Sequence, residues 1–337
     1  MKRVLLLPLL LLATAVAGCG GDDGGSSSTA APAAKADSGA FPVTIRHARG
    51  EATIPSAPKR VVAVGLRDHD TALALGVKAV GAMDWFQQGT FAKWPWEDWG
   101  GAPPQVVSDS SMDINFERLA GLAPDLILGV YQDLDKAAYG KLSRIAPTVA
   151  QSGDFKPYTM PWRDETRVIA KALGRSDEAE KRIRAIDARF AEVREQHPEF
   201  RGKQAVFVDP EGGKFFAFAS TDPRGQFLRE LGFSGAPRVD QAAKGSYGTE
   251  ISPERLDLLD VDYLFLLMDQ KHRAKVYGQS LFTRLDVVER GDVIEVPYYD
   301  KPQYGAAIAF NSVLSLPYAI DGTLKLIDAA AAKKKSR

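Results

Sequence analysis

The stretch NFERLAGLAPDLILGV at residues 115–130 has a counterpart later in the chain, SPERLDLLDVDYLFLL at residues 252–267. The two segments align without gaps and share glutamate, arginine, two leucines and aspartate at equivalent positions. Each begins with a short helical pattern and ends in an apolar run typical of a buried strand. The pair predicts one helix-to-strand unit in each of two similar lobes, with a chance similarity of helix-to-strand patterning as the alternative.

Strands alternate with helices on both sides of this pair, which is typical of an α/β fold with mostly parallel sheets. The predicted strands are residues 60–64, 79–83, 105–107, 125–130, 148–150, 204–209, 262–267 and 292–296. The predicted helices outside the connecting region are residues 70–75, 116–122, 225–231, 253–259 and 312–327.

One long helix is predicted between the lobes, over residues 176–197. Ser176 is a candidate cap, the apolar side chains recur at helical spacing, and Pro198 ends the pattern. At 1.5 Å per residue this helix spans about 33 Å, enough to brace two lobes as a stiff strut. The alternative is an ordinary lobe helix packed on one sheet.

The N-terminal region predicts export. Two basic residues precede an apolar run of about 12 residues, which matches a signal peptide over residues 1–18 and is shorter than the ~20 needed to span a bilayer. The motif VAGC, ending at the single cysteine Cys19, resembles the lipobox of bacterial lipoproteins and implies lipid on Cys19. A secreted protein with a free thiol is the alternative. Residues 19–40 are poor in large apolar side chains and predict a flexible tether.

The remaining boundaries are an N-terminal lobe at residues 41–160, a connecting helical segment at 161–200, a C-terminal lobe at 201–330 and a basic tail at 331–337. Without Lys2 and Arg3, 41 basic residues face 43 acidic ones, a net charge of −2 that does not suggest nucleic acid. We expect a monomer. The basic tail is most simply a solvated end, with attraction to a membrane surface as the alternative.

The body resembles the substrate-binding lipoproteins of ABC importers for ferric siderophores, haem and cobalamin. The resemblance rests on the order and spacing of five segments: RVVAVGLRDHDTALALGVKAVGA (60–82), FERLAGLAPDLILG (116–129), KLSRIAPTVA (141–150), IAKALGRSDEAEKRI (169–183) and FNSVLSLPYAID (310–321). The third and fifth are most similar to the ferric-siderophore branch. The resemblance implies two Rossmann-like lobes joined by a rigid helix, with a shallow cleft between them.

The resemblance also implies that one glutamate per lobe docks onto arginines of a two-fold permease in the membrane, and these map onto Glu117 and Glu254. In open α/β sheets, ligands bind at the edge formed by the carboxyl ends of the strands. Both glutamates are predicted to face the side of the cleft mouth. Each also falls in a first helical turn, where a carboxylate is stabilised by about 0.3–1 kcal/mol, so a local helix-end role is the alternative.

Ligand contacts are expected from the loops at those strand ends. In the first lobe the candidates are Arg67, Trp85 with Phe86, and Tyr131 with Gln132; in the second they are Arg224, Tyr247, Tyr298, Tyr299 and Tyr304. Arginine presents several donors to chelating oxygens, and aromatic rings supply apolar area. For each residue alone, packing is the competing interpretation; for Arg224 the alternatives are capping a helix or pairing with Glu230.

Two further classes are weighed against a siderophore receptor. Direct metal binding needs converging ligands, and the one cluster is Arg67-Asp68-His69-Asp70, where we expect an aspartate to cap the next helix and His69 to lie on the surface. We predict no protein metal site, although His69 or a tyrosine could complete the coordination of an unsaturated chelate. An enzyme is the other class, but no phosphate loop or nucleophile elbow is found, so no catalytic residue and no cofactor is predicted.

The sequence thus predicts an extracytoplasmic lipoprotein, on the cell surface or the periplasmic side, that binds a ferric siderophore between two lobes and delivers it to an ABC permease. Haem and cobalamin are the alternative ligands on the same scaffold.

Overall fold

The computed structural model describes residues 36–86, 94–108, 111–210 and 214–336, which contain two five-stranded sheets and one two-stranded sheet. The first lobe holds β3 (Val61–Ala63), β4 (Gly81–Ala82), β5 (Gln105–Val106), β6 (Leu126–Gly129) and β7 (Thr148–Ala150). These strands are all parallel, in the order β5-β4-β3-β6-β7. All of them were predicted, with ends that differ by at most two residues.

Helices cover this first sheet and connect its strands. They are α1 (Asp68–Ala74), α2 (Phe116–Gly121), α3 (Lys136–Leu142) and α4 (Trp162–Leu173). A hairpin of β1 (Val43–His47) and β2 (Gly50–Ile54) was not predicted. Its side chains alternate between buried and exposed, and Ile45 and Ile54 join the core of the first lobe. That alternation is the signal from which the hairpin could have been found.

The second lobe holds β8 (Ala205–Asp209), β9 (Phe215–Phe218), β10 (Gly248–Ile251), β11 (Tyr263–Leu267) and β12 (Val293–Val296). The order is β10-β9-β8-β11-β12, and β8, β11 and β12 are parallel as predicted. The strands β9 and β10 are antiparallel additions that the sequence analysis missed, so this sheet is mixed. Each is four residues long, and the apolar run FFAF of β9 is the signal from which that strand could have been found.

The helices of the second lobe are α6 (Pro223–Leu231), α7 (Pro237–Ala243), η3 (Pro253–Leu259), α8 (Gln270–Tyr277), α9 (Ser280–Thr283), α10 (Asp286–Glu289), α11 (Tyr304–Phe310) and α12 (Leu316–Lys335). The helix predicted at residues 253–259 is present with those bounds, as a 3-10 helix. One prediction was wrong here: residues 312–327 are not one helix, because α12 begins only at Leu316. The predicted basic tail is also part of α12, where Lys334 pairs with Asp292 at 2.7 Å.

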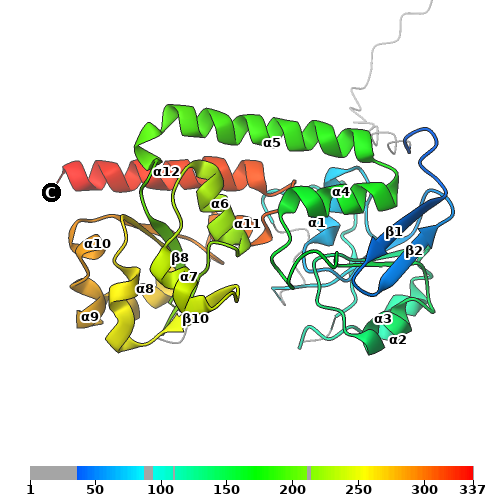
Figure 1. The fold of residues 1–337 in the computed structure, drawn as a ribbon, viewed down its shortest axis with the longest axis horizontal. Coiled ribbons are helices and arrows are strands. Elements are labelled where there is room, and N and C mark those ends of the chain that lie inside the picture. The colour runs from blue at the N-terminus through cyan, green and yellow to red at the C-terminus, as the bar shows by residue number, and fades with distance from the viewer. Residues whose placement is uncertain (1–35, 87–93, 109–110, 211–213, 337) are drawn as a thin grey trace, which may run out of the picture. The chain divides into compact units, whose positions relative to one another are not determined.

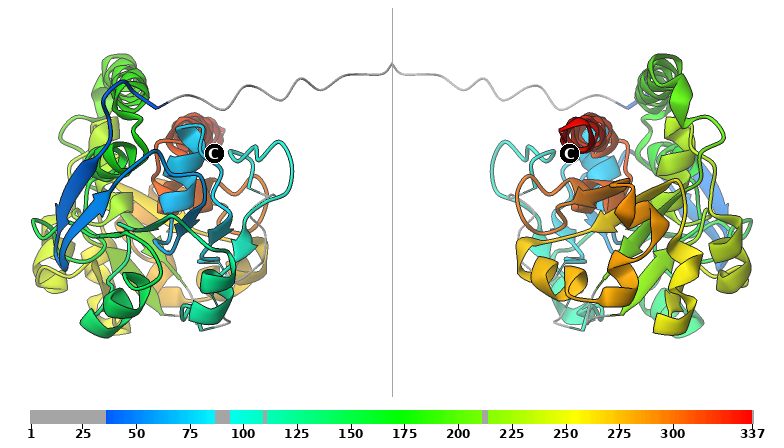
Figure 2. Two further views of the ribbon diagram at one scale, coloured as in Figure 1. Left: turned by 90° about the vertical axis from the view of Figure 1, so that its right-hand side faces the viewer. Right: turned by 90° about the vertical axis from the view of Figure 1, so that its left-hand side faces the viewer.

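The long helix α5 (Ser176–Gln196) is confirmed and packs against elements of both lobes. Figure 1 shows it running along one side of both sheets, and Figure 2 shows α12 beside it. Ala179 joins the hydrophobic core of the first lobe. Ile183, Ile186 and Phe190 join the hydrophobic core to which the second lobe contributes. Arg175, not Ser176, occupies the cap position. The helix therefore braces the two lobes as predicted, rather than serving one sheet.

We expect Gly322→Ala in α12 to destabilise the protein by about 1–3 kcal/mol through overpacking. A Cβ atom at Gly322 would lie 2.2 Å from Cδ1 of Tyr304. The measurement is chemical denaturation followed by circular dichroism. Gly140→Ala in α3 is the matched control, because no atom beyond its chain neighbours and its own helix backbone lies within 4 Å of its Cβ position among the described residues. It should stabilise by up to about 1 kcal/mol. Equal effects of the two variants would contradict the close packing of Tyr304.

Candidate ligand-binding site

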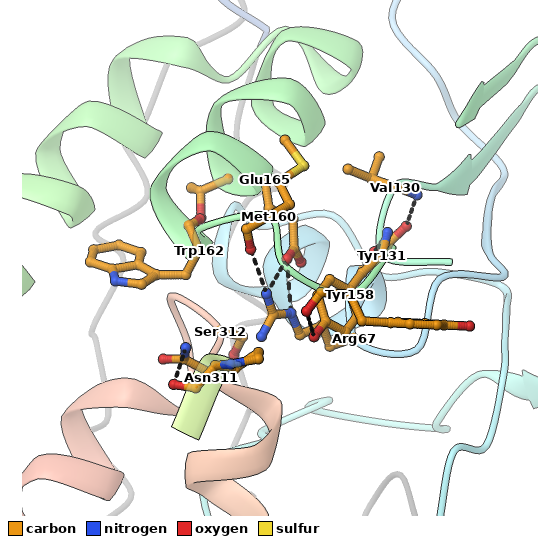
Figure 3. Close-up of polar contacts among 12 residues, drawn as sticks. Arg67, Val130, Tyr131, Tyr158, Met160, Trp162, Glu165, Asn311 and Ser312 are labelled. Carbon is orange, nitrogen blue, oxygen red and sulfur yellow. Dashed lines mark hydrogen bonds and ion pairs between the residues drawn. The ribbon is translucent and has the colours of Figure 1, made fainter. Parts of the chain in front are cut away.

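Arg67 follows β3 and is wholly buried where the two lobes meet. Its Nε donates to Oε2 of Glu165 in α4 at 2.8 Å, and Nη2 lies 2.6 Å from the same oxygen. Its Nη1 donates to the carbonyl oxygen of Phe310 in the second lobe at 2.6 Å, and its guanidinium stacks over the Tyr131 ring at 3.7 Å. Figure 3 shows Arg67 with Glu165 and Tyr131 around it and with Asn311 and Ser312 of the second lobe nearby. Arg67 has no exposed surface in this arrangement, so it joins the lobes rather than facing a ligand.

The other residues of the Arg67-Asp68-His69-Asp70 cluster are also buried. Asp68 accepts hydrogen bonds from the backbone N–H groups of Val130 and Tyr131 at 2.7 and 3.0 Å. Asp70 accepts from Ser312 Oγ of the second lobe at 2.5 Å. The expectation that an aspartate caps α1 was therefore wrong, as was the surface position of His69, which is 1% exposed.

A second buried ion pair lies in the second lobe. Arg224 Nη1 donates to the two carboxylate oxygens of Asp222 at 3.1 and 3.3 Å, so its partner is Asp222 rather than Glu230. Its guanidinium lies over the Phe218 ring at 4.0 Å. Each lobe thus contains a buried arginine held by a carboxylate and stacked on an aromatic ring.

Tyr298 follows β12, and its hydroxyl accepts a hydrogen bond from Arg224 Nη2 at 3.5 Å. Burial raises the pKa of Tyr298, an effect that the charge of Arg224 opposes. The phenol therefore keeps its proton at neutral pH. Because its oxygen accepts from Arg224, that proton is available for an acceptor on a ligand.

An aromatic hollow of about 310 Å³ adjoins this pair. It is lined by Asp209, Lys214, Phe216, Phe218, Tyr247 and Glu250 at the ends of β8, β9 and β10. The Tyr247 ring lies 5.5 Å from that of Phe216 and is 47% exposed. Phe218 both lines the hollow and stacks under the Arg224 guanidinium. Aromatic faces and a cation therefore lie side by side here.

Trp85 and Phe86, which follow β4, reach the second lobe. The Trp85 ring lies 5.7 Å from that of Phe310, and the Phe86 ring lies 5.6 Å from Tyr298 and 5.7 Å from Tyr299. Trp85 is half-buried and Tyr299 is exposed. Tyr299 keeps exposed surface beside Tyr298, since their rings lie 4.8 Å apart.

Of two further predicted contact residues, Tyr131 is buried and Tyr304 is partly buried. Tyr131 is 4% exposed and donates through its hydroxyl to the carbonyl oxygen of Tyr158 at 3.0 Å. Tyr304 packs with its ring 5.1 Å from Tyr318 and directly over Gly322. Gln132 accepts from the Tyr158 hydroxyl at 3.0 Å. The structure therefore groups Trp85, Arg224, Tyr247, Tyr298 and Tyr299, and it adds Phe216, Phe218 and Asp222, which the sequence analysis missed.

A larger hollow of about 740 Å³ lies between residues 155–163 and α6. Contacts cross it between the lobes: Gln226 Nε2 donates to the carbonyl oxygen of Thr159 at 3.2 Å, and Arg163 pairs with Glu230 at 2.5 Å. These contacts join the two lobes along this hollow.

The two docking candidates are exposed and lie in corresponding places. Glu117 is in the first turn of α2, whose cap Asn115 accepts from the N–H of Arg118. Glu254 is in the first turn of η3, directly after β10. Hydrogen bonds from its own backbone N–H and from Ser252 lower the pKa of Glu254. In Figure 1, α2 and β10 lie on the side of the body opposite α5.

Two α/β lobes braced by one long helix, with arginines and aromatic rings gathered at the strand ends, define a two-lobed solute-binding protein. The family model described as Periplasmic binding protein matches residues 61–299, and the chain belongs to that family. The resemblance found in the sequence and the predicted fold class are thereby confirmed. The family is one of binding proteins, as the sequence analysis expected.

Similar proteins cover nearly the whole body. The probable siderophore-binding lipoprotein YfiY of Bacillus subtilis is 27% identical over 75% of this chain and 79% of its own. The iron uptake ABC transporter substrate-binding protein PiaA of Streptococcus pneumoniae is 28% identical, with a TM-score of 0.72 over 86% of this chain and 99% of its own, and has also been solved with ferrichrome. A periplasmic solute binding protein of Mycobacterium smegmatis is 31% identical, with a TM-score of 0.73 over 86% and 98%.

The predicted signal peptide and Cys19 lie outside the described residues. Within the described ranges, none of the helices has the length and apolar character required for a membrane span.

Proposed function

We propose that this chain is an extracytoplasmic receptor, anchored by lipid on Cys19, that binds a ferric siderophore between its lobes and delivers it to a two-fold ABC permease. The observation that carries the proposal is the Arg224–Tyr298 pair beside the aromatic hollow of Phe216, Phe218 and Tyr247. Relatives named for siderophore binding support the same ligand class.

The chemistry of this surface suits a ferric chelate. The Arg224 guanidinium and the Tyr298 hydroxyl offer donors to the chelating oxygens. Phe216, Tyr247 and Trp85 offer aromatic faces to the apolar parts of the ligand. Asp222 holds Arg224 in place, so the donors are oriented before the ligand arrives.

Fluorescence titration of the protein with a panel of ferric siderophores, haem and cobalamin tests the ligand class. All five tryptophans, Trp85, Trp94, Trp96, Trp99 and Trp162, belong to the first-lobe side of the chain, and Trp85 lies beside the proposed site. We expect saturable quenching by at least one ferric siderophore and recovery of the chelate unchanged. Quenching by haem or cobalamin alone would support the alternative ligands, and chemical change of the chelate would contradict a receptor.

We expect Tyr247→Ala to weaken siderophore binding about tenfold or more without changing the melting temperature. Its ring is 47% exposed in the free protein and lines the hollow, so truncation removes ligand contact rather than core packing. Isothermal titration with the siderophore found in the panel gives the affinity. Leu281→Ala is the matched control, since Leu281 is 50% exposed on α9 and does not line the hollow. Equal affinities of the two variants would remove Tyr247 from the site.

A further inference from the structure

Three side chains with metal-binding atoms meet in the first lobe, beside the loop that carries Trp96 and Trp99. His69 and Asp70 belong to α1, and Glu97 belongs to the segment between Trp96 and Trp99. One ligand atom from each lies within 4.8 Å of the others. The side chains of His69 and Glu97 are 1% and 0% exposed, and Asp70 is wholly buried.

The hydrogen-bond donors around this cluster reach only one oxygen of each carboxylate. Trp96 Nε1 and Ser312 Oγ both donate to Asp70 Oδ2, at 3.0 and 2.5 Å. Trp99 Nε1 donates to Glu97 Oε2 at 3.2 Å. Among the described residues, Asp70 Oδ1 and Glu97 Oε1 have no hydrogen-bond partner. Buried carboxylate oxygens are normally satisfied by a donor or a cation, because burying them alone is costly.

We propose that His69, Asp70 and Glu97 form a binding site for a divalent transition-metal ion, with zinc as its simplest occupant. An imidazole nitrogen with two carboxylate oxygens is a donor set that zinc accepts. His69 Nε2 and Glu97 Oε1 are 3.5 Å apart, close to the separation of about 3.3 Å between two ligands of a tetrahedral zinc ion. Trp96 and Ser312 donate to Asp70 Oδ2, and Trp99 donates to Glu97 Oε2. Hydrogen bonds of this kind orient the ligands in known metal sites.

This ion is a resident of the fold and not the transported iron. All three ligands come from the first lobe and have almost no exposed surface, whereas a chelate needs an open surface. Bound there, the ion fixes the loop of Trp96 and Trp99 against α1. Through Asp70 and its hydrogen bond with Ser312, it also supports the contact with the second lobe.

A proton shared by the two carboxyl groups is the competing account. Burial raises the pKa of Glu97 to about 8, and burial also raises that of Asp70. A shared proton satisfies the two facing oxygens without a metal. The two accounts differ in whether the folded protein takes up zinc.

The experiment uses the untagged full chain, unfolded in a chelator and refolded with or without zinc so that burial does not block access. We expect one equivalent of zinc after dialysis, measured by mass spectrometry of the metal, and a higher melting temperature than that of the metal-free protein. Cobalt in place of zinc should give visible absorption bands of tetrahedral coordination. Absence of retained metal, or retention without a change in melting temperature, would overturn the site in favour of the shared proton.

Glu97→Gln and His69→Gln test the ligands. Each should weaken zinc binding by at least about tenfold, and Glu97→Gln keeps the side-chain shape, so its metal-free form should fold with a melting temperature close to that of the metal-free parent. His272→Gln is the control for a histidine outside the cluster and should bind zinc like the parent. Unchanged zinc affinity in Glu97→Gln would contradict the site. Siderophore affinity, measured in parallel, reports on the ligand site separately.

Discussion

Replacement of Glu165 by alanine is expected to reduce the free energy of unfolding by about 3–5 kcal/mol, because it leaves a buried cation without its counter-charge. Glu165 is 1% exposed, and its Oε2 receives both Nε and Nη2 of Arg67. Burial raises the pKa of Glu165, and the neighbouring charge and hydrogen bond of Arg67 oppose that effect. Urea denaturation followed by circular dichroism measures the loss.

Two further variants separate charge from packing. The double variant Arg67→Met with Glu165→Leu removes both charges and should be more stable than Glu165→Ala, since a buried ion pair is often replaceable by apolar side chains. Lys214→Ala breaks the pair with Glu250, whose side chains are 68% and 58% exposed, and should cost less than about 1 kcal/mol. A loss below about 1 kcal/mol for Glu165→Ala, or no recovery in the double variant, would show that the pair does not hold the lobes together.

The strands and α5 were predictable because their signals are local. Apolar runs of three to six residues mark the parallel strands, and the stripe of Ile183, Ile186 and Phe190 recurs at helical spacing within α5. The repeat at residues 115–130 and 252–267 also places Glu117 and Glu254 in equivalent turns.

The buried network could not be predicted in the same way, because its partners are distant in the sequence. Glu165 lies 98 residues after Arg67, and Ser312 lies 242 residues after Asp70. The sequence around Arg67 and His69 carries no signal for their burial. They are covered by the segment of Trp96 and Trp99 and by the second lobe, which lie far away in the chain. The sequence analysis therefore assigned Arg67, a charged residue at a strand end, to the ligand surface, whereas the structure buries it completely.

Charge reversal at both docking glutamates, Glu117→Arg with Glu254→Arg, is expected to reduce siderophore uptake to background while the affinity for the siderophore stays within about twofold. Both side chains are exposed and lie on α2 and η3, outside the aromatic hollow. If each carboxylate meets arginines of the permease, reversal places like charges together and costs about 2–5 kcal/mol per site, which for two sites is about a thousandfold or more in docking affinity. Uptake of labelled iron by cells and titration of the purified variant give the two numbers.

The control reverses two exposed acids on the opposite helices, Glu195→Arg on α5 with Asp328→Arg on α12. It changes the net charge equally, so an uptake defect caused by net charge alone would appear there too. If the glutamates only stabilise helix ends, the docking variant should lose about 0.3–1 kcal/mol per helix and keep its uptake. That outcome, or a loss of siderophore affinity, would contradict the docking assignment.

The two single charge reversals test whether both glutamates contribute equally to docking. A two-fold permease presents the same arginines to each lobe, so Glu117→Arg and Glu254→Arg alone should reduce uptake to a similar degree. The sites differ locally, because α2 is an α-helix with a side-chain cap, whereas η3 is a 3-10 helix. Both carboxylates are exposed, so salt should weaken both contacts alike. A strong effect at one glutamate and none at the other would place the permease against a single lobe.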